Sequence, residues 1–121
     1  MDINVFSHDF SLTPSLRDWA ARRVRFAMER FGSRIRSVRV RLSDRNGPRG
    51  GVDQRCIMEA RFFAGDSLIV ETEDTDPYQA LSRAARCLRG RVAAVIGRER
   101  DRRRFVLADG RGALSRKGDV P

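Results

Sequence analysis

The chain has 121 residues, a length that favours a single domain with a substantial core. Its 25 basic and 16 acidic side chains give a net charge of +9, and Lys117 is the only lysine. Arginine binds phosphate pairwise and stacks on bases, so this usage favours a polyanionic partner, although a GC-rich genome would produce the same bias. The first residues carry no basic leader and no long apolar run, so we expect a cytoplasmic protein with no membrane partner.

The residues that usually carry catalysis or bind metals are scarce. His8 is the only histidine, and no cysteine or carboxylate is spaced with it for a triad or a metal site. Cys56 and Cys87 lie far apart in the chain, which predicts two buried or half-buried free thiols. No glycine-rich loop opens a helix. We therefore expect no enzyme activity, no cofactor, no metal and no small-molecule substrate.

The chain opens with a short strand over residues 3–6 and a loop over 7–12. Thr13 and Pro14 predict the start of a helix, because a capping oxygen is followed by proline at the first helical position. Gly32 predicts its end as a left-handed cap. Arg23 lies within the apolar stripe, so either its stem is buried and its charge reaches solvent, or its charge is held in a cleft beside the second helix. The stripe comprises Leu16, Trp19, Ala20, Val24, Ala27 and Phe31.

Three further strands are predicted over residues 35–43, 54–63 and 67–74, where apolar and polar side chains alternate. A loop rich in glycine and proline separates the first two, and a turn at residues 64–66 separates the last two. The outward positions suggest a cross-strand charge ladder, which we interpret as stabilising and not as a site. Its members are Arg39, Arg41, Glu59, Arg61, Glu71 and Glu73.

A second helix is predicted from Pro77, with Asp76 as its cap and Gln79 as the other half of a capping box. One side is apolar, and comprises Leu81, Ala84, Ala85, Leu88, Val92, Val95 and Ile96. The other side is basic: Arg83 and Arg86 lie opposite the apolar side, and Arg89 and Arg91 flank it. Residues 77–97 contain no carboxylate, whereas a merely solvated helix face usually mixes signs. We interpret this helix as the working surface and its partner as polyanionic.

This order of elements predicts an α+β fold, β-α-β-β-β-α, with a four-stranded mixed sheet and two helices packed on one face. The first strand should pair parallel to the second. We expect the folded domain to span residues 1–97 and residues 98–121 to form a basic, disordered tail.

The register of two segments carries a family resemblance. Ile3-Asn4-Val5 with Leu12–Trp19, and Asp76–Leu81 with its pattern of Asp, any residue, Tyr, then Ala and an aliphatic, resemble the ribosome hibernation-promoting factor and ribosome-associated translation inhibitor family. The resemblance covers Met1 to about Val95. The short tail is similar to that of the short form, for which we expect a monomer off the ribosome.

The resemblance implies a regulator of the stress response in stationary phase, which binds the small ribosomal subunit and its rRNA in the decoding channel. There it would exclude tRNA and mRNA and silence idle ribosomes. The RNA contacts implied by the resemblance and by the basic helix face are Arg22, Arg23, Arg25, Arg83, Arg86, Arg89 and Arg91. The family usually has an acid at Ser82, a lysine at Cys87 and a basic or amide residue at Gly90, so no contact is carried over to Cys87 or Gly90.

Two other functions remain open at the level of sequence. A general RNA- or DNA-binding protein of the nucleoid type needs only the basic face. A protein adaptor that acts through its tail needs only the last residues.

Overall fold

The computed structural model describes residues 1–8, 12–44 and 54–109, with side chains as far as Asp101. The chain divides into two compact units, Met1–Gly90 and Arg91–Pro121, and each is described by itself. The predicted glycine- and proline-rich loop and the last part of the predicted tail, residues 45–53 and 110–121, lie outside the described residues.

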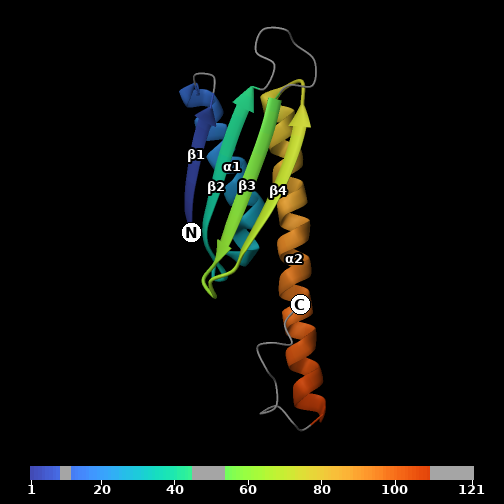
Figure 1. The fold of residues 1–121 in the computed structure, drawn as a ribbon. Coiled ribbons are helices and arrows are strands. Elements are labelled where there is room, and N and C mark those ends of the chain that lie inside the picture. Colours follow the sequence, from blue (N-terminus) through green and yellow to red (C-terminus); the bar gives the residue numbers. More distant parts are fainter. Residues whose placement is uncertain (9–11, 45–53, 110–121) are drawn as a thin grey trace. The chain divides into compact units, whose positions relative to one another are not determined.

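The first unit contains a four-stranded sheet in the order β1-β2-β3-β4 (Figure 1). The strands are β1 (Asp2–His8), β2 (Ile35–Asp44), β3 (Gln54–Phe62) and β4 (Ser67–Asp74). β1 pairs parallel to β2, and the other neighbours are antiparallel. The predicted mixed sheet is therefore confirmed.

Strand β1 is longer than predicted, because its pairing with β2 continues as far as His8 opposite Ser43. Ser7 and His8, which we expected in a loop, therefore belong to the sheet. Arg17 of the following helix donates from Nη1 to the carbonyl oxygen of Val5 at 3.3 Å. This bond ties the edge strand to the helix that follows it.

Two helices, α1 (Pro14–Met28) and α2 (Pro77–Asp109), complete the predicted β-α-β-β-β-α order, and α1 and the start of α2 lie behind the sheet in Figure 1. The hydroxyl of Thr13 accepts a hydrogen bond from the Leu16 N–H at 3.1 Å, which confirms Thr13 as the cap of α1. The predicted left-handed cap at Gly32 is wrong, since its φ is −56°. A 3₁₀ turn, η1 (Glu29–Phe31), follows α1 instead, and the chain passes Gly32 in a right-handed conformation.

The start of α2 is held by two aspartates. The Tyr78 N–H donates to Asp76 Oδ1 at 3.1 Å, which confirms Asp76 as the cap. The predicted capping box with Gln79 is wrong, because the Asp76 N–H already donates to Asp74 Oδ1 at 3.3 Å. That hydrogen bond, followed by those from Thr75 and Arg83, lowers the pKa of the Asp74 carboxyl.

The core of the first unit lies between the sheet and the two helices. The sheet contributes the inward side chains Val5, Val38, Val40, Leu42, Cys56, Met58, Ala60 and Val70. The helices contribute Leu16, Ala20, Val24, Ala27, Met28, Ala80, Leu81, Ala84, Ala85 and Leu88. Burial raises the pKa of the Cys56 thiol to about 12. Cys87, which we also expected to be at least half-buried, is exposed because it lies one turn after the exposed Arg83 on α2.

Helix α2 continues beyond the expected end of the domain. Residues 98–109, predicted to be disordered, are helical in the second unit. The prediction of disorder rested on the high density of charge in this segment. The segment contains no glycine or proline that would break a helix, and a charged sequence of this kind can remain helical. The boundary at residue 97 stays a prediction. None of the described helices is long and apolar enough to cross a membrane.

Candidate nucleic-acid interface

Helices α1 and α2 meet along a seam in the first unit. At one end, the rings of Trp19 and Tyr78 are in edge-to-face contact with their centroids 5.0 Å apart. At the other end, Phe26, Glu29 and Arg30 line a hollow of about 190 Å³ together with Arg89 of α2. Because both contacts advance along both helices, α1 and α2 run in the same direction.

The three predicted arginines of α1 lie at different depths. Arg22 and Arg25 are exposed, and Arg23, next to the buried Val24, is half-buried. Residues three or four apart share one side of a helix, so Arg22 and Arg23 both lie between Trp19 and Phe26 on the side that faces α2. Arg22 and Arg23 therefore border the seam, and Arg25 lies further out.

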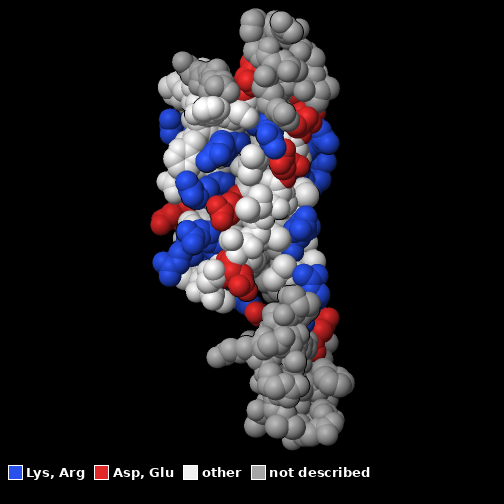
Figure 2. All heavy atoms as spheres, in the orientation of Figure 1, with Lys and Arg blue, Asp and Glu red and all other residues white. Residues whose placement is uncertain are grey.

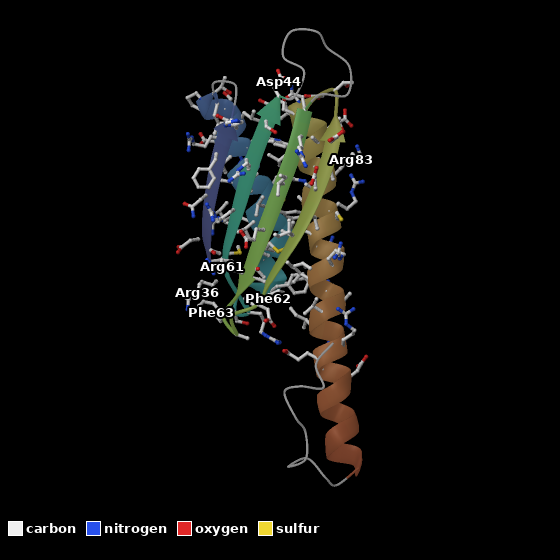
Figure 3. All side chains as sticks on the ribbon, in the orientation of Figure 1. Arg36, Asp44, Arg61, Phe62, Phe63 and Arg83 are labelled. Carbon is white, nitrogen blue, oxygen red and sulfur yellow. The ribbon has the colours of Figure 1, made fainter. Side chains whose placement is uncertain are left out.

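The predicted arginines of α2 are all exposed, but they do not share one environment. A three-residue step rotates a side chain by about 60° around a helix, so the row Arg83, Arg86 and Arg89 runs obliquely. Arg89 reaches the hollow beside α1. Arg83 is bound at the opposite flank, where its Nη1 donates to the Glu73 carbonyl oxygen at 2.7 Å and to Asp74 Oδ2 at 3.4 Å (Figure 3). Arg91 is exposed in the second unit.

Sequence reasoning missed two residues beside the predicted arginines. Phe26 is 70% exposed, although phenylalanine normally packs inside, and Arg30 lies over the ring of its neighbour Phe31 at 5.5 Å. The signal was present in the sequence, because Phe26 falls outside the apolar stripe of α1 and lies one turn after Arg22. We call the group Arg22, Arg23, Arg25, Phe26, Arg30, Arg86 and Arg89 the helix-pair surface.

The helix-pair surface has one dominant sign of charge. Within α1, η1 and residues 77–90 of α2, all of which the structure describes, the only acids are Asp18 and Glu29. The open face of the sheet differs, since basic and acidic side chains are interspersed there (Figure 2). Arg55 on that face forms a salt bridge with Glu71.

This arrangement is better suited to binding a phosphate backbone than to catalysing a reaction. Guanidinium groups presented on one side of two neighbouring helices bind successive phosphates, and exposed rings between them provide surfaces for bases. Among the described residues, no group of three or more His, Cys, Asp or Glu side chains is placed to hold a metal ion.

The fold and the helix-pair surface together define a small α+β domain with a basic two-helix side. The model of the family described as sigma 54 modulation protein / S30EA ribosomal protein matches residues 3–100, and the chain belongs to this family. The resemblance predicted from the sequence is thereby confirmed.

Solved structures share the fold. The Protein Y N-terminal domain of Thermus thermophilus is similar with a TM-score of 0.63 and 24% identity, over 76% of this chain and 96% of that one. A ribosomal subunit interface protein from Coxiella burnetii is similar with a TM-score of 0.64 and 13% identity, over 80% of this chain and 99% of that one. The sequence has no significant match among curated proteins.

Proposed function

We propose that the protein binds the small ribosomal subunit near the decoding channel through its helix-pair surface. It would occupy the space of tRNA and mRNA there and so inhibit translation in idle ribosomes. Membership of its family makes the chain a ribosome-associated factor, and the similar Coxiella structure is named for the ribosomal subunit interface. The partner is the rRNA of the small subunit, the setting is the cytoplasm of cells in stationary phase or under stress, and the protein off the ribosome is a monomer.

One observation carries the proposal: the arginines of the helix-pair surface have few acids beside them. Only Asp18 and Glu29 interrupt the basic charge in the described parts of α1, η1 and residues 77–90. A surface of one sign repels itself unless a counter-charged partner covers it, and rRNA supplies that charge at regular spacing. Inhibition then follows from occupancy, because a folded domain in the channel leaves no room for tRNA or mRNA.

The structure shows which arginines of α2 can be reversed to test ribosome binding without disturbing the fold. Reversal of Arg83 would place a carboxylate beside Asp74 and disturb the start of α2, so its effect on binding would be hard to interpret. Arg86 and Arg89 are exposed, and they follow the buried positions Ala85 and Leu88 without belonging to the core. The variant of choice is therefore Arg86→Glu with Arg89→Glu.

A matched control carries the same change of charge on the sheet. Arg36→Glu with Arg61→Glu reverses two exposed arginines of the sheet, one on β2 and one on β3 (Figure 3). Co-sedimentation with purified small subunits should show at least a tenfold loss of affinity for the helix variant and a loss below about threefold for the control. The parent should also compete with tRNA for the subunit and lower translation in a purified system.

Two results would contradict the proposal. If the helix variant still bound subunits and inhibited translation like the parent, the helix-pair surface would not be the contact. If the parent bound DNA and ignored ribosomes, the chain would be a general nucleic-acid binder of the nucleoid type, a function that its net charge of +9 alone allows.

A further inference from the structure

The open face of the sheet carries a groove that lies on the opposite side from the two helices. The groove has a volume of about 510 Å³ and crosses β1, β2 and β3. Its lining includes Phe6, His8, Arg39, Arg41, Arg55 and Ile57. None of the residues described as lining it is a carboxylate. The groove is therefore the basic part of a face whose charges are otherwise mixed.

Arg39, one of the six members of the predicted charge ladder, stacks on an aromatic ring. Glu59 lies opposite Arg39 in the register of β2 and β3, yet the Arg39 guanidinium lies over the Phe6 ring, 5.4 Å from its centroid. Phe6 itself is 43% exposed. An aromatic ring and a guanidinium plane that are already stacked provide a flat surface on which a further planar group can stack.

Arg41 adds a positive charge with apolar neighbours on both sides. In the register of the sheet, Arg41 lies between Phe6 of β1 and Ile57 of β3. Arg55, further along, is neutralised by its salt bridge with Glu71. Towards β4 a smaller hollow of about 200 Å³ continues from the groove and adds Glu59 and Ile69. The positive charge of the groove is therefore concentrated on the side of β1 and β2, at Arg39 and Arg41 beside Phe6.

We infer that this groove is a second nucleic-acid site, separate from the helix-pair surface, which binds a short segment of single-stranded RNA. A base would stack on Phe6, and the adjoining phosphates would contact Arg39 and Arg41. A volume of this size holds a nucleotide or two and not a duplex, because small-ligand sites have volumes of roughly 300–1,000 Å³.

RNA fits the groove better than an acidic peptide. A peptide carboxylate would use the arginines but not the exposed face of Phe6, whereas every base presents a planar surface to a ring. A ribosome-associated protein also meets RNA as its commonest polyanion. The site does not depend on the proposed contact with the small subunit, since no residue of the helix-pair surface lines it.

The test measures the binding of fluorescein-labelled hexauridylate and hexaadenylate by fluorescence anisotropy at low salt. Phe6→Leu keeps the apolar bulk and removes the ring, and should weaken binding about tenfold, whereas Phe6→Tyr should bind like the parent. Arg41→Gln should weaken binding about threefold or more through the loss of one phosphate contact.

Each variant has a matched control outside the groove. Phe63 is 53% exposed and has Arg36 over its ring at 5.2 Å, so Phe63→Leu removes a similar pair at the far end of the sheet (Figure 3). Arg61→Gln removes an exposed charge from β3. Both controls should change the affinity for the oligonucleotides less than twofold.

Several results would overturn the inference. These are an absence of hexanucleotide binding, an equal loss in the Phe63 and Arg61 controls, or displacement of the RNA by hexaglutamate at similar concentration. Loss of hexanucleotide binding in Arg86→Glu with Arg89→Glu would assign the oligonucleotide to the helix-pair surface instead. The groove would be supported as the RNA site by shifts of backbone amide signals in β1 and β2 on addition of RNA, together with an unchanged circular dichroism spectrum of Phe6→Leu.

Discussion

The helix-pair surface and the open face of the sheet are both rich in arginine, but their arginines have different neighbours. On the sheet, Arg55 is bound to Glu71, and Glu59 lies opposite Arg39 in the register of β2 and β3. In α2, the described residues from Pro77 to Gly90 contain no acid, so the charge of Arg86 and Arg89 is not compensated within the helix. The number of arginines alone does not identify a nucleic-acid surface. What matters is whether acidic side chains nearby neutralise their charge.

The largest expected difference between the two faces is in the salt dependence of ribosome binding. Each phosphate contact contributes about 0.7 to 0.9 to the slope of log affinity against log salt. Arg86→Gln with Arg89→Gln should therefore lower that slope by about 1.5 for small subunits, as measured by sedimentation at several salt concentrations. Arg36→Gln with Arg61→Gln should leave the slope unchanged. Equal slopes for all three proteins would remove the distinction between the faces.

Cysteine labelling provides a second way to separate the two faces. Burial raises the pKa of the Cys56 thiol to about 12, so at pH 8 very little of its reactive thiolate is present, whereas Cys87 is exposed on α2. A bulky maleimide should modify Cys87 alone in the folded protein and both thiols in urea, as mass spectrometry would show. The labelled protein should lose small-subunit binding and keep hexauridylate binding. Retention of subunit binding would mean that this side of α2 is not covered by the ribosome.

The seam between the helices should matter for stability in proportion to its burial. Trp19 is half-buried against Tyr78, so Trp19→Ala should cost about 2–3 kcal/mol, less than the loss at a fully buried tryptophan. Phe26→Ala, at a position that is 70% exposed, should change the free energy of unfolding by less than about 0.5 kcal/mol. Urea denaturation measures both. A large cost at Phe26 would show that its ring packs in solution and does not serve as a free surface.

The smallest effect concerns pH and the start of α2. The pKa of Asp74 is lowered in the fold, so its ionised form adds stability above its unfolded pKa, and this stability is lost as the pH falls through the folded pKa. Asp74→Asn should therefore lower the Tm slightly at pH 7, and the difference from the parent should vanish in acid. Thermal unfolding between pH 2 and pH 7 measures this. A difference that persisted at the lowest pH would point to geometry and not to charge.

Much of the fold followed from local patterns. Alternation in β2, β3 and β4 predicted the sheet, and the caps at Thr13 and Asp76 predicted where both helices start, because each signal lies within a few residues. The errors arose where a distant or competing group decided the outcome. Asp74 took the N–H that Gln79 was expected to bind.

In the candidate site, too, local patterns predicted some features correctly and missed others. Helical periodicity predicted the exposure of Arg86 and Arg89, because each helix buries only one side. It did not predict that Asp74 binds Arg83, or that the Arg39 guanidinium lies over the Phe6 ring. Those contacts join different strands and helices, and spacing within one element carries no information about them.

The bond from Arg17 to Val5 has a consequence for how the protein behaves at high concentration. An edge strand such as β1 offers backbone groups to any other chain, which is a common route to aggregation. Here the Val5 carbonyl is already occupied, and the group that occupies it is charged. A second molecule that extended the sheet at β1 would have to displace a guanidinium and leave it without its acceptor. The fold thus carries its own protection against self-association along this edge.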